Sequence, residues 1–171
     1  AEKPGALKAV SGRLTSTKGE SELLYGKVPP QAIPLEEVVL GAIMIDKDGF
    51  PSIIEILRPE SFYLEKNQVV FQVMSELFAK SQPIDLLTVH EALKKSGQLE
   101  FAGGLPYLME LTNKVGSAAN IEFHARIIAQ KFIQRELIRV STQVINESFE
   151  DTKDVLEILD DAERGLFDIT D

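Results

Sequence analysis

Residues 117–149 constrain the fold most strongly, because a helical pattern runs through them without interruption. At 1.5 Å per residue such a helix is about 50 Å long, which exceeds the diameter of a small domain. Its apolar residues do not share one face, so one neighbouring helix cannot cover them all. They form two seams with coiled-coil-like spacing and one further set. The first seam contains Ile121, Ala125, Ile128 and Phe132, the second Ile133, Leu137, Val140 and Val144, and the further set Ile127, Ile138, Ile145 and Phe149.

A second helix is predicted over residues 152–169, with Asp151 as its expected N-cap. The connection between the two helices, FEDTKD, is short, so they are expected to fold back as an antiparallel helical hairpin. The terminal helix has an apolar stripe with matching spacing, which includes Ala162 and Ile169. The predicted hairpin packing joins Ile133, Leu137, Val140 and Val144 to Val155, Leu159 and Leu166.

The preceding region, residues 31–116, is also helical by pattern. Pro34 stands in a first-turn position, Asp85 is an expected N-cap, and Gly97 is expected just beyond a helix end. No strand-like alternation extends beyond a few residues. We predict an all-α fold with a compact bundle of about five helices over 31–116, followed by a helical hairpin over 117–171.

Residues 1–30 differ from the rest in composition and are predicted to form a basic flexible tail. Residues 1–31 hold five Lys and Arg against three Asp and Glu, whereas the remainder holds 13 against 24. An acidic body repels phosphate groups, so this chain alone is not expected to bind DNA directly. The chain has no cysteine, no membrane-length apolar run and no secretory signal at its start, so we expect a cytoplasmic location and no membrane contact.

Motifs for catalysis, metal binding and nucleotide binding are incomplete. His90 and Glu91 begin the segment HEALK, but Lys94 stands where a zinc protease motif needs its second histidine. His124 lacks the Glu-x-x-His pairing of di-iron bundles. In GRLTSTKG, Thr17 replaces the second glycine of a phosphate-binding loop. We therefore predict no catalytic residue, metal site or cofactor in this chain.

Two explanations remain for the several apolar faces of the long helix. The bundle and the returning helix together cover them all, or the hairpin keeps an apolar stripe for another chain. Composition does not distinguish these two explanations.

Five segments in order carry a family resemblance: PPQAIPLEEVVLGAIMID, ILRPESFYLEKNQVVF, PIDLLTVHEALKKSGQLEFAGGLPYL, SAANIEFHARIIAQKFIQRELI and AERGLFDIT. The chain resembles the N-terminal domain of bacterial DnaB-type replicative DNA helicases over residues 28–171. The resemblance implies a helical bundle and hairpin whose hairpins pair between subunits, giving the N-terminal collar of a hexamer built as a trimer of dimers.

The resemblance also implies an assembly and primase-docking module that works with a helicase loader and meets DNA only through the hexamer. The parent protein is expected to unwind duplex DNA 5′–3′ with ATP and Mg in a motor domain, which is expected to follow after a linker. Two alternatives remain open: the helicase-binding domain of a primase, and another all-α interaction module.

The segment SAANIEFHARII matches the family's subunit-pairing and primase-responsive region. Its predicted interface residues are Ile121 and Ile127, with Glu122 and Arg126 as polar rim groups, and Ile138 and Ile145 extend the interface along the same helix. The segment IPLEE departs from the family pattern, which more often has an alanine flanked by acids.

Overall fold

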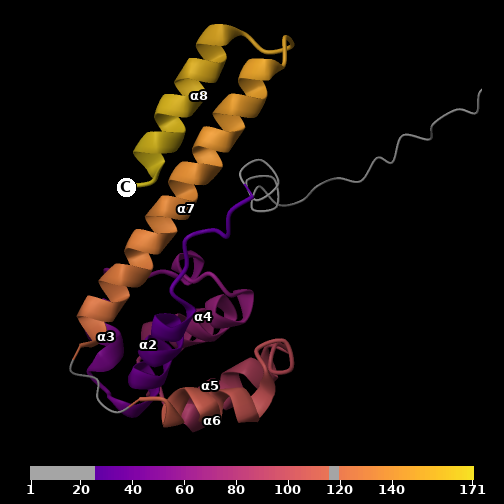
Figure 1. The fold of residues 1–171 in the computed structure, drawn as a ribbon. Coiled ribbons are helices and arrows are strands. Elements are labelled where there is room, and N and C mark those ends of the chain that lie inside the picture. Colours follow the sequence, from indigo (N-terminus) through magenta and orange to yellow (C-terminus); the bar gives the residue numbers. More distant parts are fainter. Residues whose placement is uncertain (1–25, 116–119) are drawn as a thin grey trace, which may run out of the picture. The chain divides into compact units, whose positions relative to one another are not determined.

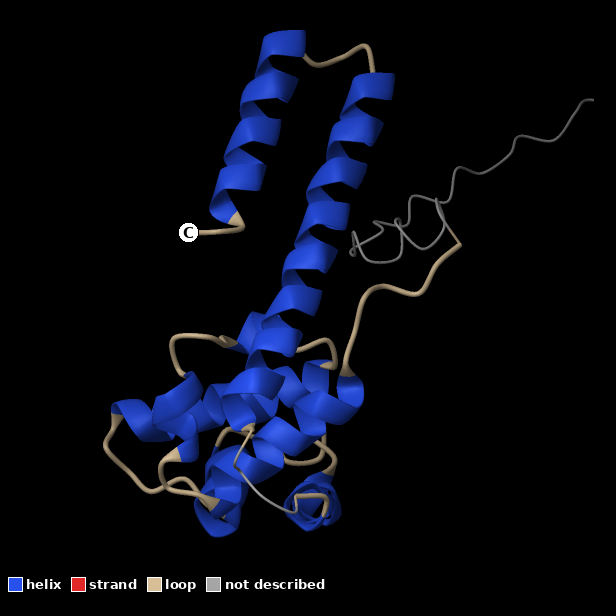
Figure 2. Ribbon diagram, turned by 60° about the vertical axis from the view of Figure 1, so that its left-hand side comes forward, coloured by secondary structure: helices blue, strands red, loops and turns tan. Residues whose placement is uncertain are grey.

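The computed structural model describes residues 26–115 and 120–171, and every regular element within these ranges is helical (Figure 2). The all-α prediction is therefore confirmed. In chain order the elements are α2 (Ile33–Ile45), α3 (Gly49–Ile53), the short 3-10 helix η1 (Pro59–Ser61), α4 (Glu65–Ala79), α5 (Leu86–Lys95), α6 (Gly104–Asn113), α7 (Ile121–Phe149) and α8 (Val155–Asp168) (Figure 1).

The chain divides into two compact units, and the division falls inside α7. The globular unit is Pro30–Leu137, and the hairpin unit contains Ile138–Asp171 with the described residues 26–29. The predicted boundary at residue 117 differs from this division between residues 137 and 138, because the first half of α7 contributes to the core of the globular unit. The predicted tail lies almost entirely outside the described residues.

Helix α2 is buried around most of its circumference and forms the centre of the globular unit. Pro34 occupies its first turn, as predicted, where a missing N–H leaves no helical hydrogen bond unmade. At Gly41 a Cβ would overlap the backbone oxygen of Leu111 in α6 and approach Val115 Cγ2 to 2.5 Å. The absence of a side chain at Gly41 therefore lets α2 and α6 pack at backbone distance.

Phenylalanine rings from α3, from Phe62 just after η1 and from α4 fill the other side of the core. The ring of Phe71 lies 5.4 Å from Phe50 and 5.0 Å from Phe62 between centroids, and Phe78 lies 4.9 Å from Phe50. All three pairs are tilted, an arrangement that aromatic quadrupoles favour over face-to-face stacking. This cluster fixes the short α3 against the longer α4.

Glu36 is a fully buried acid at the start of α2. Its carboxylate accepts the Tyr63 N–H at 2.7 Å and the Asn67 side-chain amide at 3.0 Å, with a longer approach of 3.4 Å from the Leu64 N–H. These donors lie at the N-terminal end of α4, where unpaired N–H groups favour an anion. Asn67 in turn accepts the Tyr107 hydroxyl from α6, and burial raises the pKa of Tyr107, so this hydroxyl stays protonated. Glu36 thus connects α2, α4 and α6.

Arg135 fixes the first half of α7 within the globular unit. Its guanidinium donates to the Pro30 carbonyl at 2.8 Å and to the Ser61 carbonyl at 2.9 Å, and lies 5.4 Å from the centroid of the Tyr63 ring. Burial lowers the pKa of Arg135, while the carboxylate of Glu36 acts in the opposite direction.

The predicted ends of α5 are confirmed. Asp85 Oδ1 accepts the Thr88 N–H at 2.9 Å, and the Thr88 hydroxyl accepts the Asp85 N–H at 2.9 Å, which is a capping box. Gly97 has φ of 71°, and beyond it the Gln98 N–H donates to the Leu93 carbonyl at 2.9 Å.

Just beyond the end of α4, Ser81 has φ of 54°, in a conformation that favours glycine. The Ser81 N–H donates to Phe78 and the Gln82 N–H to Leu77, both at 2.9 Å, as in a Schellman motif. We expect Ser81→Gly to raise the free energy of unfolding by about 0.5–1 kcal/mol, because it removes the Cβ penalty at positive φ. Urea denaturation measures this gain.

The matched control for Ser81→Gly is Ser96→Gly, since Ser96 ends α5 with φ of −79°. That substitution offers no relief of strain and should leave stability unchanged or slightly lower. Equal responses of the two variants would contradict the role assigned to the backbone at Ser81.

Beyond residue 138, α7 and α8 run side by side in opposite directions, joined by a short turn (Figures 1 and 2). The predicted antiparallel hairpin is confirmed. The predicted cap of its second helix, Asp151, is wrong: Asp154 is the N-cap, and its carboxylate accepts the Leu156 N–H at 2.8 Å.

The contact face between α7 and α8 overlaps the predicted one at Val140, Val144 and Ala162, but on α8 it is turned toward Ile158 and Gly165. A Cβ at Gly165 would lie 3.1 Å from Val140 Cγ1, and Ile158 on the same side of α8 is buried. Ala162 and Gly165 line the space beside Val140 and Val144. Since both residues are small, the two helices approach closely on this side.

Val155, Leu159 and Leu166 are 74%, 55% and 48% exposed, so the prediction that they pack inside the hairpin is wrong. Their spacing was correctly recognised as one face of a helix. Periodicity alone does not determine whether that face or its neighbour meets α7, and the steric fit of Gly165 decides it.

Lys153 stabilises the turn of the hairpin. Its ammonium group lies 2.6 Å from Asp161 in α8 and 3.3 Å from Glu147 in α7. Hydrogen bonds to these carboxylates raise the pKa of Lys153, and the hydrogen bond from Lys153 lowers the pKa of Asp161. The group is near the surface, so salt screens the attraction.

Candidate protein-interaction surfaces

The start of α7 was predicted to carry the interface, and the structure divides its residues between core and surface. Ile121 is 8% exposed and belongs to the core of the globular unit, so its proposed role as an interface residue is corrected to a core role. Glu122 and Arg126 are exposed and Ile127 is partly buried. Ile121 shares the first apolar seam with Ala125, whose burial also belongs to the core.

Phe123 is an exposed residue of this region that the sequence pattern does not single out. Its side chain is 65% exposed, and its ring meets His124 edge-on at 6.2 Å between centroids. Phe123 and Ile127 are four residues apart and therefore share a helix face. The four-residue spacing of this pair was the sequence feature that could have indicated the exposed face. The longer 4-3-4 pattern of the buried seam is more regular and was chosen in its place.

The other predicted residues of α7 lie further along the helix. Ile138 and Ile145 are partly buried in the hairpin unit, so neither is a fully exposed interface residue. Ile133 and Leu137 fall in the globular unit and remain partly exposed, and their predicted packing in the hairpin stays a prediction. We define the α7 surface as four residues at the start of α7, of which three are exposed and Ile127 is partly buried: Glu122, Phe123, Arg126 and Ile127.

The hairpin unit has a second apolar surface on α8. We call Val155, Leu156, Leu159, Leu166 and Phe167 the outer face of α8, since each of these side chains is substantially exposed. Large exposed apolar groups on one helix face mark an interaction site more often than scattered ones do.

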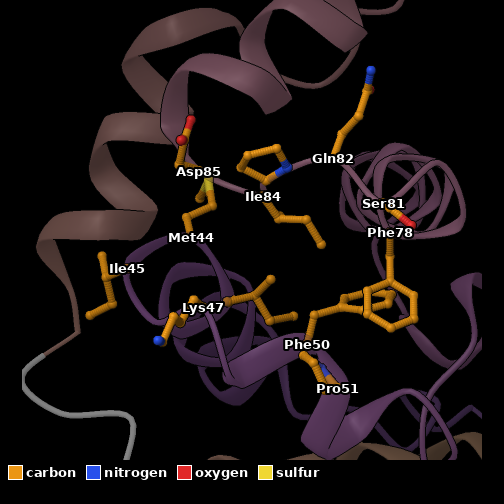
Figure 3. A pocket seen from close by; sticks show the side chains of 12 residues that line it. Met44, Ile45, Lys47, Phe50, Pro51, Phe78, Ser81, Gln82, Ile84 and Asp85 are labelled. Atoms are coloured by element: carbon orange, nitrogen blue, oxygen red, sulfur yellow. The ribbon is translucent and has the colours of Figure 1, made fainter.

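A groove of about 740 Å³ opens on the globular unit between the end of α2, α3 and the loop after α4 (Figure 3). Its wall is mainly apolar, with Phe50, Phe78 and Ile84 prominent, and Lys47 and Asp85 lie at its edge. Asp85 is already engaged in capping α5. The groove presents no pair of titratable groups suited to acid–base chemistry.

The described residues contain no group of three or more His, Asp or Glu side chains arranged to hold a metal ion. None of the helices in the described part of the chain is long and apolar enough to cross a membrane. The surface features that remain are apolar faces with charged neighbours, which suit protein–protein contacts.

These features define a class of protein: an all-helical interaction module made of a small bundle whose last helix continues into a hairpin. The family model described as the DnaB-like helicase N terminal domain matches residues 28–130. The chain belongs to this family.

The relatives agree with this assignment. A replicative DNA helicase DnaB from Rhodothermus marinus is 45% identical over 146 residues, covering 85% of this chain and 15% of that protein. One from Geobacillus stearothermophilus is 38% identical over 150 residues, covering 88% of this chain and 33% of that protein. The chain thus spans a third or less of these two relatives.

Solved structures support the same fold. The crystal structure of the N-terminal domain of DnaB helicase from Mycobacterium tuberculosis matches with a TM-score of 0.78 at 34% identity, covering 82% of this chain and 99% of that one. A DnaB-like replicative helicase, described with its interactions with primase, matches with a TM-score of 0.63 at 26% identity, covering 80% of this chain and 30% of that one. The family assignment leaves the alternative of a primase domain without support.

Proposed function

We propose that this chain is the assembly and primase-docking module of a bacterial replicative DNA helicase. The observation that carries the proposal is the family match over residues 28–130, together with exposed apolar groups on α7 and α8 that its own fold does not cover. The relative described with its interactions with primase supports the choice of partner.

In this proposal the chain contributes to the N-terminal collar of a hexamer, through pairing of neighbouring subunits. The parent protein unwinds duplex DNA in the bacterial cytoplasm with ATP and Mg bound by a motor domain outside this chain. A helicase loader is a further proposed partner, and DNA contacts the parent hexamer. The module itself positions proteins and performs no chemistry.

The first test concerns self-association through the α7 surface. We expect the chain to form dimers or larger assemblies as its concentration rises, and Ile127→Asp to weaken this association at least about tenfold. A carboxylate placed among apolar contacts loses hydration without gaining a partner. Sedimentation velocity across a concentration series measures the change, and primase binding is measured in parallel by calorimetry.

Leu87→Asp is the matched control, because Leu87 is an exposed leucine on α5, away from the α7 surface in sequence. It should leave association and primase binding unchanged. A chain that stays monomeric at high concentration and binds no primase would contradict the proposed function.

A further inference from the structure

Two grooves of the globular unit adjoin the loop that joins α4 to α5. The larger is the groove of about 740 Å³ between the end of α2, α3 and this loop (Figure 3). The smaller has a volume of about 580 Å³ and lies between α4 and α5. Gln82 and Pro83 line both grooves, so the loop is the ridge that separates them. A bound segment that crosses this ridge can occupy both grooves at once.

The larger groove offers apolar surface to such a segment. Phe50 is buried in its wall, while Ile45 and Phe78 are 52% and 38% exposed. In Figure 3 the side chains of Phe50, Phe78 and Ile84 lie around the same space. Grooves of this size and lining bury the apolar groups of a ligand. Covering Ile45 and Phe78 removes apolar surface from water, which favours binding.

The larger groove has no net positive charge. Its charged wall residues are Lys47 and Asp85. The Asp85 carboxylate already accepts the Thr88 N–H at 2.9 Å in the cap of α5. Asp46 and Asp48 flank Lys47 in the sequence and offset its charge. The larger groove therefore selects apolar groups.

The smaller groove differs, because lysines stand at its edge. Lys80 is the C-cap of α4 and Lys95 is the last residue of α5, and both line the groove. Lys94 precedes Lys95, and all three lysines are exposed. Among the residues that the structure describes, none of these three has an ion-pair partner. Their charges are therefore available to a bound group.

Two glutamates also line the smaller groove, and each has a neighbour on its own helix. Glu76 Oε1 accepts the side-chain amide of Gln72 at 3.0 Å, and Glu91 Oε1 lies 3.5 Å from His90 Nδ1. A lysine at a helix C-terminus is favourable by itself, so these lysines alone do not define a site. Their position beside an apolar groove, on a chain with a net charge of −9, distinguishes this edge. With three lysines against two glutamates, the edge attracts carboxylates.

We propose that these two grooves together bind an acidic, apolar segment of a partner protein. Its leucine-like or phenylalanine-like side chains fill the larger groove, and its carboxylates, beyond the loop, lie against Lys80 and Lys95. The site goes beyond subunit assembly and primase docking, because every residue that lines it lies between positions 43 and 96, outside α7 and α8.

The test adds three fluorescent synthetic peptides of equal length to the full chain. The first has an apolar half of leucine and phenylalanine and an acidic half of glutamate. The second has lysine in place of glutamate, and the third has serine in place of the apolar residues. Fluorescence anisotropy measures the binding of each peptide. We expect the first peptide to bind at least about tenfold more tightly than the other two, since it alone matches both grooves.

A charge reversal tests the contribution of the lysines. Lys80→Glu should weaken binding of the first peptide about threefold to tenfold, because it removes one attraction and adds a repulsion. Lys27→Glu is the matched control, at an exposed lysine outside the globular unit. It makes the same change in net charge and should alter the affinity by less than about twofold.

A second pair of variants tests the apolar contribution. Ile45→Ser should weaken binding of the first peptide about fivefold or more, because it removes apolar surface from the larger groove. Leu87→Ser, at an exposed leucine that lines neither groove, should leave the affinity unchanged. All four substituted residues are exposed, and circular dichroism verifies that each variant is folded.

Amide chemical shifts of the chain locate the first peptide. The N–H groups of Ser81, Gln82 and Ile84 belong to the loop between the grooves and its edge, so their signals should shift on binding. Largest shifts in α7 or α8 would overturn the proposal.

Equal affinity for the first two peptides, or undiminished binding in both Lys80→Glu and Ile45→Ser, would also overturn it. So would tight binding of the third peptide, since attraction of anions to lysines would then be the whole effect. Loss of the chain's own association in Lys80→Glu would identify a second copy as the occupant and exclude a separate partner. The effect of Ile127→Asp on self-association bears on the proposed function alone.

Discussion

Replacing Glu36 by leucine is expected to lower the free energy of unfolding by about 2–5 kcal/mol, because it leaves buried hydrogen-bond donors without their acceptor. The substitution removes the carboxylate that accepts these hydrogen bonds and leaves the groups that donate them in place. The Tyr63 N–H and the Asn67 amide, at 2.7 and 3.0 Å from the carboxylate, would be left without it inside the globular unit. Each buried donor without an acceptor costs about 1–3 kcal/mol.

Two variants separate this effect from a general response to substitution. Glu36→Gln keeps one acceptor oxygen but turns an NH₂ group toward a donor, so a smaller loss of about 1–3 kcal/mol is expected. Glu91→Leu replaces an exposed acid on α5 and should change stability by no more than about 0.5 kcal/mol. Urea denaturation followed by circular dichroism measures the stability of all three variants. If Glu36→Leu had the same unfolding midpoint in urea as the unmodified chain, the stabilising role of Glu36 would be refuted.

Replacing Gly41 by valine is expected to cost about 3 kcal/mol or more, since overpacking a close backbone contact forces α2 away from α6. The Cβ position already overlaps the Leu111 carbonyl oxygen, which belongs to a helical backbone and cannot rotate aside. The second neighbour, Val115 Cγ2 at 2.5 Å, could move only by shifting the segment after α6. Thermal and urea unfolding measure the loss.

A graded series tests the steric explanation. Gly41→Ala removes the entropic penalty of glycine in a helix, worth about 0.5–1 kcal/mol, yet should still destabilise because of the clash. Gly49→Ala is the control, since its Cβ would lie 3.3 Å from the nearest atom, Ile43 Cα, and a small shift accommodates it. A stabilising Gly41→Ala would show that α2 and α6 are not in the close contact described.

Neither residue had a distinctive signal in the sequence. Glu36 follows Pro34 in the first turn of a helix, where an acid is ordinarily exposed and favourable. Its burial depends on the start of α4 lying against α2, a contact between residues far apart in the chain. Gly41 sits within an apolar helix, and only the position of α6 shows why a side chain is excluded there.

The same limit applies to the interaction surfaces. The spacing of Ile121, Ala125 and Ile128, four and then three residues apart, correctly identified one face of α7, and the structure buries these residues in the globular core. On α8, the spacing of Val155, Leu159 and Leu166 also identified a real face, which the structure leaves exposed. In both cases periodicity defined the set of residues, and a neighbouring helix determined whether the set was covered.

The sequence by itself determined the all-helical class, the caps of α5 and the antiparallel hairpin, because these depend on contacts within a few residues or on short connections. The tertiary structure alone decided which apolar face is buried, where an acid is buried, and where glycine lets helices meet. These outcomes depend on distances between residues far apart in the chain, such as Gly165 and Val140, which a one-dimensional pattern does not contain.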